Sequence, residues 1–463
     1  MFHKENPAYK RQEIGFYALE DLVPQDHLLR QIDEVIDFSF IYDLVKDSYS
    51  IDQGRPSLDP VLLVKIPLIQ TLFGIRSMRQ TIKEIEVNLA YRWFLGLTLE
   101  DQVPHFTTYG KNYSRRFQEK KLIEHIFAHI LRLCLQNKLI DPSDIFIDGT
   151  HVKAAANNHK FINQEVDLQA KFMSKNLENE INQIREKELK KPLAPAKEKG
   201  ASSKKVSTTD PESGWFHKGD HKQVFAYNVQ AACDKYGWVL GYSVHAGNVH
   251  DSQAFPALFA KVESFSPTYL IADSGYKTPS IAKFLLDRLI TPVFPYTRPK
   301  GVKGNLRPKD FVYDEHFDAY LCPEHQVLTY ATITREGYRT YKSQATICQN
   351  CPLLSHCTTS RNHQRLLTRH IWQEYLEQCE EIRHQRGMKE RYKQRKECIE
   401  RIFGTAKEYH HMRYTRLIGK SRMEDFVGLI FACLNLKKLV KRMAGKPFYF
   451  AFILLDKQNF VSY

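Results

Sequence analysis

The order of apolar segments between residues 145 and 294 constrains the fold of this chain more than any other feature. Short apolar or alternating runs are typical of buried strands, and apolar residues three and four positions apart are typical of amphipathic helices. Here the two patterns follow one another as three strands, a helix, a strand, a helix and a strand, which indicates an α/β domain with a mixed sheet flanked by helices. The expected strands are 145–147, 223–231, 238–245, 268–272 and 291–294, and the expected helices are 252–262 and 279–288.

Composition and periodicity divide the rest of the chain into further parts. Helical spacing dominates the N-terminal third, with helices expected at 25–40, 59–73 and 77–97. A Lys-, Ala-, Pro- and Ser-rich stretch at 160–212 indicates a charged flexible insertion, with a helix at 165–191 as the alternative. A final helical region begins near Thr368. We expect an all-α N-terminal domain at 1–138, the α/β domain at 139–300 and 361–445, a small Cys-rich insert at 301–360 and a C-terminal tail at 446–463.

The chain is basic, with 67 Lys and Arg against 53 Asp and Glu and a formal net charge of +14. Such a charge favours a polyanionic partner, most commonly nucleic acid, and plain solubility charge is the alternative. One short basic segment follows Thr107 and Thr108, either of which could begin a helix as its N-cap. This segment is compatible with a helix-turn-helix that contacts DNA or with a bundle that has a solvated basic face. Its basic residues are Lys111, Arg115 and Arg116.

Three features of the sequence indicate a cytosolic protein without a membrane partner. No run reaches the roughly 18–20 apolar residues that a bilayer span needs. The first residues are polar and contain no apolar signal-peptide region. The 9 cysteines are odd in number, and several lie within apolar helical patterns, which argues against a disulfide framework. We therefore expect a reducing compartment.

Aspartates close two of the expected strands. Asp148 directly follows the strand at 145–147, and Asp273 directly follows the strand at 268–272. If these two strands are parallel neighbours, their ends point the same way and the two carboxylates meet. An aspartate after a strand is more often a helix cap or a turn former, so each residue alone is a weak signal.

A third carboxylate, Glu400, lies on an expected helix whose Ile399, Ile402 and Phe403 would pack on the sheet. Glu397, one turn earlier, is its competitor, and a solvated glutamate is the ordinary alternative for either. Carboxylates at the ends of rigid elements suit Mg²⁺, which prefers oxygen ligands. Two such ions, roughly 3.5–4 Å apart, can activate an attacking oxygen and stabilise a leaving one in phosphodiester chemistry.

Five segments of the chain resemble the DDE transposases of bacterial insertion sequences. The resemblance extends to the N-terminal segments DQGRPSLDPVLLVKI and TLFGIRSMRQ, so it spans nearly the whole chain. It implies a ribonuclease H-like core, which has the strand order expected above, and a catalytic triad of Asp148, Asp273 and Glu400 that binds two Mg²⁺ or Mn²⁺ ions. The five segments are IFIDGTHVKAAAN around Asp148, GWFHKGDHKQVFAYNVQAACD at 214–234, GNVHDSQAF at 247–255, IADSGYKTP around Asp273 and RKECIERIFGTAKEYHHMRYTRL around Glu400.

The same family often carries a Tyr, Arg, Glu and Lys signature, which Tyr392, Arg395, Glu400 and Lys407 resemble. One residue more than usual separates Arg395 from Glu400, and Lys396 occupies the usual Arg position, so the resemblance is best at Lys407. A basic side chain one or two turns from the metal site would bind a phosphate near the cut. The alternative is a solvated basic helix face.

Residues between the two aspartates offer weaker signals. Asp251 is most simply the N-cap of the helix that follows it. His250 could form a hydrogen bond near the metal site or contact DNA. The aromatic segment 215–217 could stack on an unpaired base at a transposon end, although core packing is the simpler explanation.

Four cysteines of the insert have spacing that suits a structural zinc site, because thiolates bind Zn²⁺ tetrahedrally. They include one Cys-x-x-Cys pair with two outlying partners, and either of two histidines could replace a ligand. Reduced cysteines in a small subdomain are the alternative. The cysteines are Cys322, Cys348, Cys351 and Cys357, and the histidines are His325 and His356.

The hypothesis that follows is a transposase that binds terminal inverted repeats, cuts the element ends and joins them to target DNA. Its partners would be double-stranded DNA and a second copy of the chain, in the nucleoid-associated cytosol of a bacterium. The alternatives are a catalytically silent or domesticated DNA-binding protein, a nuclease of the same superfamily, and a structural protein organised around the Cys-rich insert.

Overall fold

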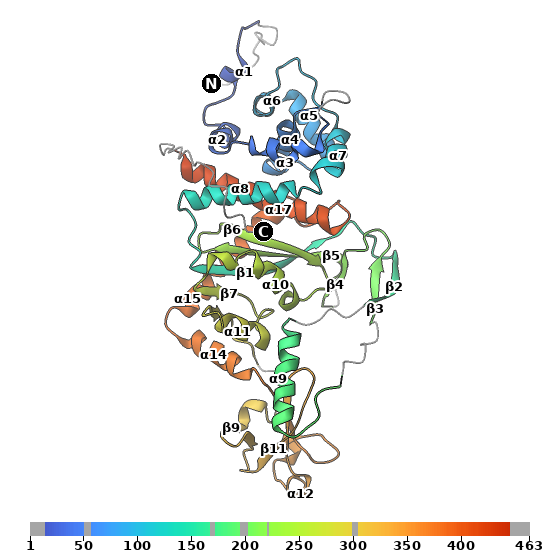
Figure 1. Ribbon diagram of the computed structural model, residues 1–463, viewed down its shortest axis with the longest axis vertical. Coiled ribbons are helices and arrows are strands. Elements are labelled where there is room, and N and C mark those ends of the chain that lie inside the picture. The colour runs from blue at the N-terminus through green and yellow to red at the C-terminus, as the bar shows by residue number, and fades with distance from the viewer. Residues whose placement is uncertain are drawn as a thin grey trace, which may run out of the picture. The chain divides into compact units, whose positions relative to one another are not determined.

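The computed structural model of this chain describes residues 14–50, 57–166, 172–194, 202–219, 222–298 and 304–444. The expected C-terminal tail at 446–463 lies outside the described residues. The chain forms two compact units, a helical unit and a sheet unit (Figure 1). The helical unit comprises Met1–Leu139, Thr405–Met412 and Glu424–Tyr463, and the sheet unit comprises Ile140–Gly404 and Arg413–Met423.

The helical unit consists of short helices whose ends are set by local sequence. Asp59 accepts a hydrogen bond from the backbone N of Val61 at 2.7 Å and so caps α4, which begins with a proline. Gly96, with φ of 70°, ends α6 in the left-handed conformation that glycine adopts at low cost. The helices are α1 (Leu19–Leu22), α2 (Leu28–Val35), α3 (Phe40–Val45), α4 (Pro60–Leu72), α5 (Met78–Val87), α6 (Leu89–Leu95), α7 (Phe106–Asn112), α8 (Leu122–Gln136) and most of α17 (Lys420–Met443).

Two of the helices expected from periodicity are interrupted. The expected helix at 25–40 stops at Val35, and Asp37 then accepts hydrogen bonds from the backbone N and the hydroxyl of Ser39, at 2.9 and 2.6 Å. The expected helix at 77–97 is split by Asn88, whose side chain accepts a bond from the backbone N of Tyr91 at 3.1 Å. In both places a short polar side chain bonds to the nearby backbone and competes with the helix, a local effect that apolar spacing does not report.

The sheet unit contains a mixed sheet with the strand order β4-β5-β1-β7-β8, in which β6 also pairs with β5. β1 is antiparallel to β5 and parallel to β7, and β7 is parallel to β8. The predicted order of strands and helices is present, and β4, which contains the aromatic segment 215–217, adds one strand to the five expected. The elements are β1 (Asp144–Lys153), β4 (Gly214–Lys218), β5 (Lys222–Asp234), β6 (Val239–Ala246), α10 (Asp251–Ala260), β7 (Tyr269–Ile271), α11 (Pro279–Leu286) and β8 (Thr291–Val293).

The central strands are buried on both faces. Ile145, Phe146 and Ile147 are consecutive in β1 and all are buried, although successive side chains of a strand point to opposite faces. Leu270 and Ile271 in β7 are buried in the same way. A strand covered on both sides reads as a continuous apolar run, which is why these two short segments were recognisable in the sequence.

The lysine-rich insertion at 160–212 is more ordered than we expected. Its described residues form a two-stranded antiparallel sheet and a helix, and the helix lies within the segment 165–191 that was given as the helical alternative. Ile181 is fully buried, and the ammonium of Lys205 lies over the rings of Phe161 and Trp215, at 4.6 and 4.8 Å from their centroids. Lysine stems therefore cover aromatic surface here, a role that composition alone does not reveal. The elements are β2 (Phe161–Val166), α9 (Ser174–Lys187) and β3 (Ser202–Ser207).

The Cys-rich insert forms its own five-stranded antiparallel sheet, with the order β13-β12-β11-β10-β9. Its small core contains Phe311, Tyr320, Leu328, Tyr341 and Leu367. The sheet continues past the expected boundary at 360, because the segment near Thr368 pairs with β12 as a strand and not as the start of a helix. The elements are β9 (Val312–Asp314), β10 (Ala319–Leu321), β11 (Val327–Ile333), β12 (Tyr338–Lys342), α12 (Ala345–Cys348), α13 (Leu354–Cys357) and β13 (Leu366–His370).

After the insert the chain is helical, in pieces. The segment that carries the Tyr, Arg and Glu of the signature changes from α15 to a 3₁₀ turn and then to α16, so it is not one continuous helix. Within the described residues, no helix combines the length and the apolar content needed to span a bilayer. The elements are α14 (Gln373–His384), α15 (Met388–Lys393), the 3₁₀ turn Gln394–Lys396 and α16 (Ile399–Tyr409).

Candidate active site

The parallel pairing of β1 with β7 sets Asp148 and Asp273 at the same level of the sheet. Phe146 is the register partner of Ile271, and each aspartate follows its strand residue by two positions. Asp148 does not close its strand as expected, because β1 continues to Lys153 by pairing with β5 on its other side. Asp273 does lie just beyond the end of β7, and its charge acts on Asp148. The sequence prediction that parallel strands bring these two residues together is consistent with this register.

Asp148 lies in an environment that disfavours its charged form. Burial raises the pKa of its carboxyl to about 6, the guanidinium of Arg395 acts in the opposite direction, and the negative charges of Asp273 and Asp251 raise the pKa further. Arg395 Nη2 lies 3.0 Å from Asp148 Oδ2, and the backbone N of Gly149 donates to Oδ1 at 2.9 Å. A largely buried carboxylate beside two others has the oxygen donors that suit a divalent cation, and Arg395 only partly balances the negative charge.

The prediction that Asp251 is the N-cap of the following helix is wrong. The N-cap of α10 is His250, whose Nδ1 accepts a hydrogen bond from the backbone N of Ser252 at 3.2 Å, and Asp251 is the first residue inside the helix. Asp251 Oδ1 instead accepts hydrogen bonds from the side chains of Asn228 and Gln230. One signal in the sequence could have identified this group of polar residues. In the segment AYNVQA, two amide side chains alternate with apolar residues, and the strand that contains them is buried on both faces.

Glu400 is more exposed to solvent than Asp148 and Asp273 are. It is exposed in the first turn of α16, while Ile399, Ile402 and Phe403 are buried as the sequence predicted. Its competitor Glu397 is exposed as well. Across the part of the chain that the structure describes, no group of three or more His, Cys, Asp or Glu side chains is arranged to hold a metal ion. The parallel register of β1 and β7 therefore sets Asp148 and Asp273 at the same level of the sheet. A position of Glu400 beside them stays a prediction.

The basic residues of the signature occupy different surroundings. Arg395 is 6% exposed, and in addition to its ion pair with Asp148 it donates from Nη1 to the hydroxyl of Tyr392 at 3.3 Å. We expected both side chains to contact DNA, yet the structure pairs them with groups of the protein. Lys407 is half-buried on α16, two turns beyond Glu400.

The basic segment of the helical unit begins at a different residue from the one expected. His105, and neither Thr107 nor Thr108, caps α7 through its Nδ1, and the helix runs on into a π-helical turn at Tyr113–Phe117. Lys111 and Arg115 are exposed. The guanidinium of Arg116 lies 4.2 Å from the centroid of the Tyr49 ring and donates to Asn112, so this arginine packs within the unit.

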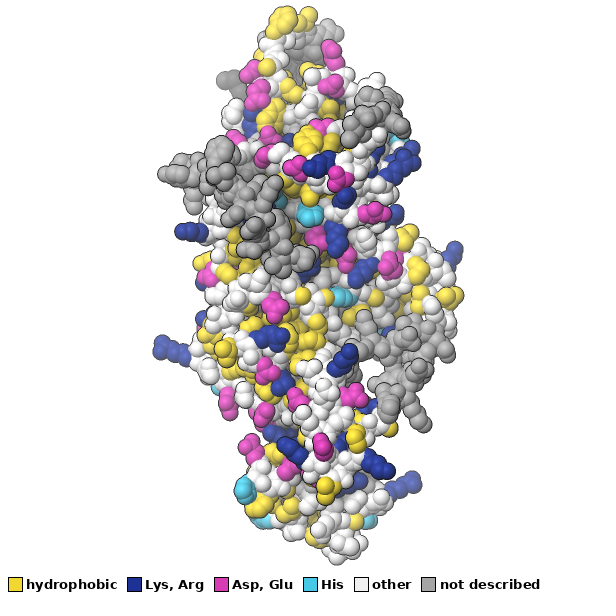
Figure 2. All heavy atoms as spheres, viewed as in Figure 1, with side chains coloured by type: hydrophobic (Ala, Val, Ile, Leu, Met, Phe, Trp, Pro, Cys, Tyr) yellow, Lys and Arg dark blue, Asp and Glu magenta, His cyan; other side chains and the backbone are white. Residues whose placement is uncertain are grey.

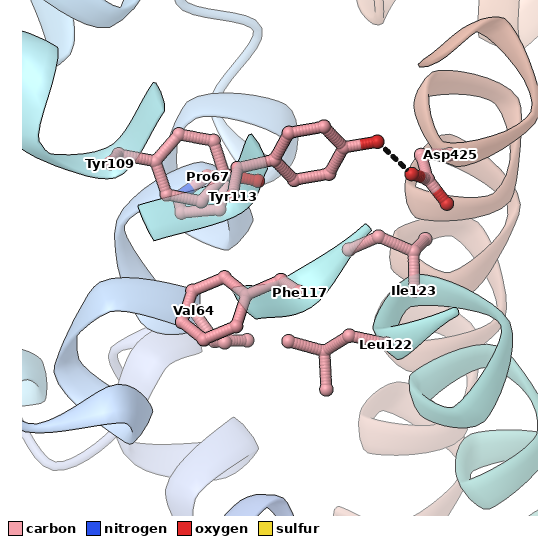
Figure 3. Close-up of a pocket in the computed structure, with 8 residues that line it drawn as sticks. All are labelled: Val64, Pro67, Tyr109, Tyr113, Phe117, Leu122, Ile123 and Asp425. Carbon is pink, nitrogen blue, oxygen red and sulfur yellow. Dashed lines mark hydrogen bonds between the residues drawn. The ribbon is translucent and has the colours of Figure 1, made fainter. Parts of the chain in front are cut away.

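The opposite face of the same segment lines a small, mostly apolar pocket of the helical unit (Figure 3). The Tyr113 hydroxyl donates a hydrogen bond to the carboxylate of Asp425 there, and burial raises the pKa of Asp425 to about 6. One face of the segment therefore anchors it in the unit while the other presents basic side chains. The lining residues are Val64, Pro67, Tyr109, Tyr113, Phe117, Leu122, Ile123 and Asp425.

The aromatic segment at the start of β4 is largely engaged in packing. The Trp215 ring meets Phe225 edge-on at 4.8 Å between centroids, and Phe216 stacks on His151 at 3.6 Å. Both side chains keep part of their surface exposed, and His217 is exposed. Core packing, the simpler of the two interpretations, accounts for these contacts.

Three cysteines of the insert act electrostatically on the fourth, Cys357. Burial raises the pKa of the Cys357 thiol, Arg365 lowers it, and Cys348, Cys351 and Cys322 raise it. The backbone N of Gln326 donates to Cys322 Sγ at 3.3 Å. All four are free cysteines, half-buried at the edge of the insert's small core or in the turns beside it. Among the residues that the structure describes, these cysteines are not arranged as a metal site.

The surface charge is mixed on the face drawn in Figure 2, where Lys and Arg side chains lie among Asp and Glu side chains. Any DNA contact made there would involve individual basic residues and their neighbours.

Two separate parts of the chain match family models of transposases. Residues 17–115 match the transposase domain DUF772, and residues 321–440 match a transposase DDE domain. The chain is thus similar to transposase domains in these two segments, neither of which contains Asp148 or Asp273. More particularly, the two together support an insertion-sequence DDE transposase.

The chain is also weakly similar to two solved structures, a crystal structure of the Mos1 strand transfer complex and a Mos1 transposase paired-end complex with left transposon end. The first is 10% identical with a TM-score of 0.16, and the match covers 54% of this chain and 63% of that one. The second is 11% identical with a TM-score of 0.14, covering 51% and 60%. The match thus spans less than two thirds of each of those chains. No curated protein matches the sequence.

Proposed function

We propose that this protein binds the terminal inverted repeats of an insertion sequence, cuts the DNA at the ends of the element and joins those ends to target DNA. The observation that carries the proposal is the parallel pairing of β1 with β7, which sets Asp148 and Asp273 at one level in a buried environment. The two transposase family matches support the same activity.

The catalytic group in this proposal is Asp148, Asp273 and Glu400, which would hold two Mg²⁺ or Mn²⁺ ions. Bound there, such ions supply activation of the attacking oxygen and stabilisation of the leaving one. The chain's own contribution is to hold the carboxylates on rigid elements, the first two by the sheet and the third by α16, whose buried Ile399 and Phe403 fix the helix. Arg395 partly balances the charge of Asp148.

Basic side chains would hold the DNA phosphates. Lys111 and Arg115 are exposed, so these two are the simplest candidates, and the half-exposed Lys407 is a third. Tyr392, Arg395 and Arg116 have partners within the protein, so contact with DNA would require them to exchange those partners.

The proposal includes a ribonuclease H-like core and a protein that acts as a homodimer on DNA in the bacterial cytoplasm, associated with the nucleoid. The strand order β6-β5-β1-β7-β8, with the first three strands antiparallel and the last two parallel to β1, supports such a core. A dimer follows from the chemistry, because the two ends of an element must be joined together.

The proposal also includes one structural Zn²⁺ held by Cys322, Cys348, Cys351 and Cys357. The electrostatic effect of the other three cysteines on Cys357 supports a common location. The hydrogen bond from a backbone N–H to Cys322 Sγ supports it further, because such bonds stabilise a thiolate ligand. Reduced cysteines without metal are the competing outcome.

The decisive experiment is cleavage of labelled DNA carrying the element's ends, with Mg²⁺ or Mn²⁺ and sequenced products. Asp148→Asn should abolish cleavage, because it removes a carboxylate charge at the site, while binding of end DNA stays largely intact. Glu263→Gln, an exposed acid elsewhere in the sheet unit, is the matched control and should cut as the wild type does.

Each result separates one alternative. Wild-type protein that binds the ends but never cuts would indicate a DNA-binding protein without catalysis. Cutting without strand transfer would indicate a nuclease. An Asp148→Asn protein that cuts at the wild-type rate would overturn the assignment of the site.

A further inference from the structure

We propose that Asp251 is a fourth acidic residue of this site, held in position by Asn228, Gln230 and Tyr276, and that it shares a divalent cation with Asp273. This inference rests on the proposed function, since it adds a residue to the same site.

A buried network of polar side chains fixes the Asp251 carboxylate. Asn228 Nδ2 and Gln230 Nε2 donate to Asp251 Oδ1 at 2.9 and 2.7 Å. The Tyr276 hydroxyl donates to Gln230 Oε1, and Gln230 Nε2 lies 2.9 Å from Asn228 Oδ1. Asn228, Gln230 and Tyr276 are at most 1% exposed. Buried polar side chains are costly unless each is satisfied, and here Asn228 and Gln230 bond to one carboxylate while Tyr276 bonds to Gln230.

An ordinary role in the helix does not require this network. The N-cap of α10 is already supplied by His250, so Asp251 is not needed to cap the helix. Two amide donors occupy Oδ1 and thereby fix the orientation of the carboxylate, which settles where its second oxygen lies.

Two glycines beside the catalytic aspartates make room for that carboxylate. Gly149 follows Asp148, and a Cβ there would lie 2.8 Å from Asp251 Oδ1 and 2.4 Å from Gln230 Nε2. A Cβ at Gly275 would lie 3.0 Å from Asp251 Oδ2 and 3.1 Å from Asp273 Oδ1. The second oxygen of Asp251 and an oxygen of Asp273 are therefore both within 3.1 Å of one point.

The charge balance at this point favours a cation. Asp251 and Asp273 both act on Asp148 as negative charges, and the ion pair recorded for Asp148 is with Arg395. One recorded guanidinium thus faces three carboxylates, so the group retains negative charge that a divalent cation would balance. Oxygen donors fixed by other side chains are what Mg²⁺ and Mn²⁺ require, and the supporting hydrogen bonds commonly change metal affinity by about 10- to 100-fold.

The test measures Mn²⁺ binding to the full-length protein without DNA, by isothermal titration calorimetry. Asp251→Asn keeps an oxygen that can accept from Asn228 and Gln230 but removes the negative charge, so the fold should persist while Mn²⁺ affinity falls by at least about tenfold. Gln230→Leu, which removes the positioning bond and leaves the carboxylate, should weaken binding in the same direction. Glu263→Gln is the control and should bind Mn²⁺ as the wild type does.

The outcomes separate this inference from the proposed function. If Asp148→Asn and Asp273→Asn lose Mn²⁺ binding while Asp251→Asn retains wild-type affinity, Asp251 is not part of the site and the proposed function stands. A folded wild-type protein that neither binds Mn²⁺ nor cuts end DNA overturns both. Circular dichroism verifies that each variant is folded, and Asp251→Ser provides a second variant if Asp251→Asn does not fold.

Discussion

Arg395 illustrates at the scale of a single residue how position changes the role of a charged side chain. The sequence suggested an exposed arginine that binds a phosphate, whereas the structure buries its guanidinium against Asp148 and Tyr392. Both members of this ion pair are largely withdrawn from water, with 7% and 18% of their side-chain surfaces exposed. A pair of this kind adds little net stability, but removing one member leaves an uncompensated buried charge.

This leads to a prediction for Arg395→Met. The variant should be less stable than the wild type by about 3 kcal/mol, because Asp148 loses its cationic partner while Asp273 and Asp251 remain beside it. Urea unfolding without divalent metal ions, followed by tryptophan fluorescence, measures the change.

A double variant provides the internal control. Arg395→Met combined with Asp148→Asn should recover most of the lost stability, since no unpaired charge is then buried. Equal destabilisation of the single and double variants would show that lost packing, and not charge, accounts for the effect.

The Cys-rich insert shows at the scale of an element that a small sheet can have its own core. Five short strands enclose mainly aromatic residues, among them Phe311, Tyr320 and Tyr341. A core of this size is modest, and small units of this kind often depend on a metal for stability. The cysteines lie at one edge of that core and in the adjacent turns, where a bound ion would join turns from distant parts of the sequence.

We therefore predict that the protein, purified without chelators under reducing conditions, contains about one zinc ion per chain. Elemental analysis measures the content. Cys351→Ser should reduce it strongly, because a thiolate ligand is lost, whereas Cys379→Ala should not, because Cys379 is a buried cysteine of α14 outside the insert. Wild-type protein free of zinc, with an unchanged melting temperature after zinc is added, would contradict the prediction.

The net charge of +14 is a property of the whole molecule, and its consequence is an affinity for polyanions that depends on salt. Basic side chains that bind phosphates displace counterions from DNA, so the binding constant falls steeply as salt rises. On the face drawn in Figure 2 basic and acidic side chains are interspersed, so charge alone is a weak guide to where DNA binds.

Binding of end DNA should accordingly weaken about a thousandfold or more between 50 and 200 mM salt if about six phosphates are contacted. Fluorescence anisotropy over this range gives the slope. Lys111→Ala with Arg115→Ala should reduce the slope by about two, since each removes one phosphate contact. A slope near zero for the wild type would contradict a role for these charges in DNA binding.

The sequence determined those features that depend on neighbours along the chain. Strands that are buried on both faces are often apolar runs, so 145–147 and 268–272 were recognisable, and an aspartate after each indicated that the two carboxylates would meet if the strands were parallel. Helix breaks at Asp37 and Asn88 were missed, because a side chain that bonds to its own backbone competes with apolar spacing only locally.

Only the tertiary structure decided which side chains surround Asp148 and Asp273. Asp251, Asn228, Gln230 and Tyr276 come from three separate segments, and no spacing in the sequence relates them before β5, α10 and the loop after β7 pack together. Burial also depends on contacts between distant segments. From the sequence, Arg395 is expected to be a solvated helix residue, whereas in the structure it is packed away from water against Asp148. Periodicity reports which face of an element is apolar, whereas the partners of a buried polar group depend on contacts between distant segments.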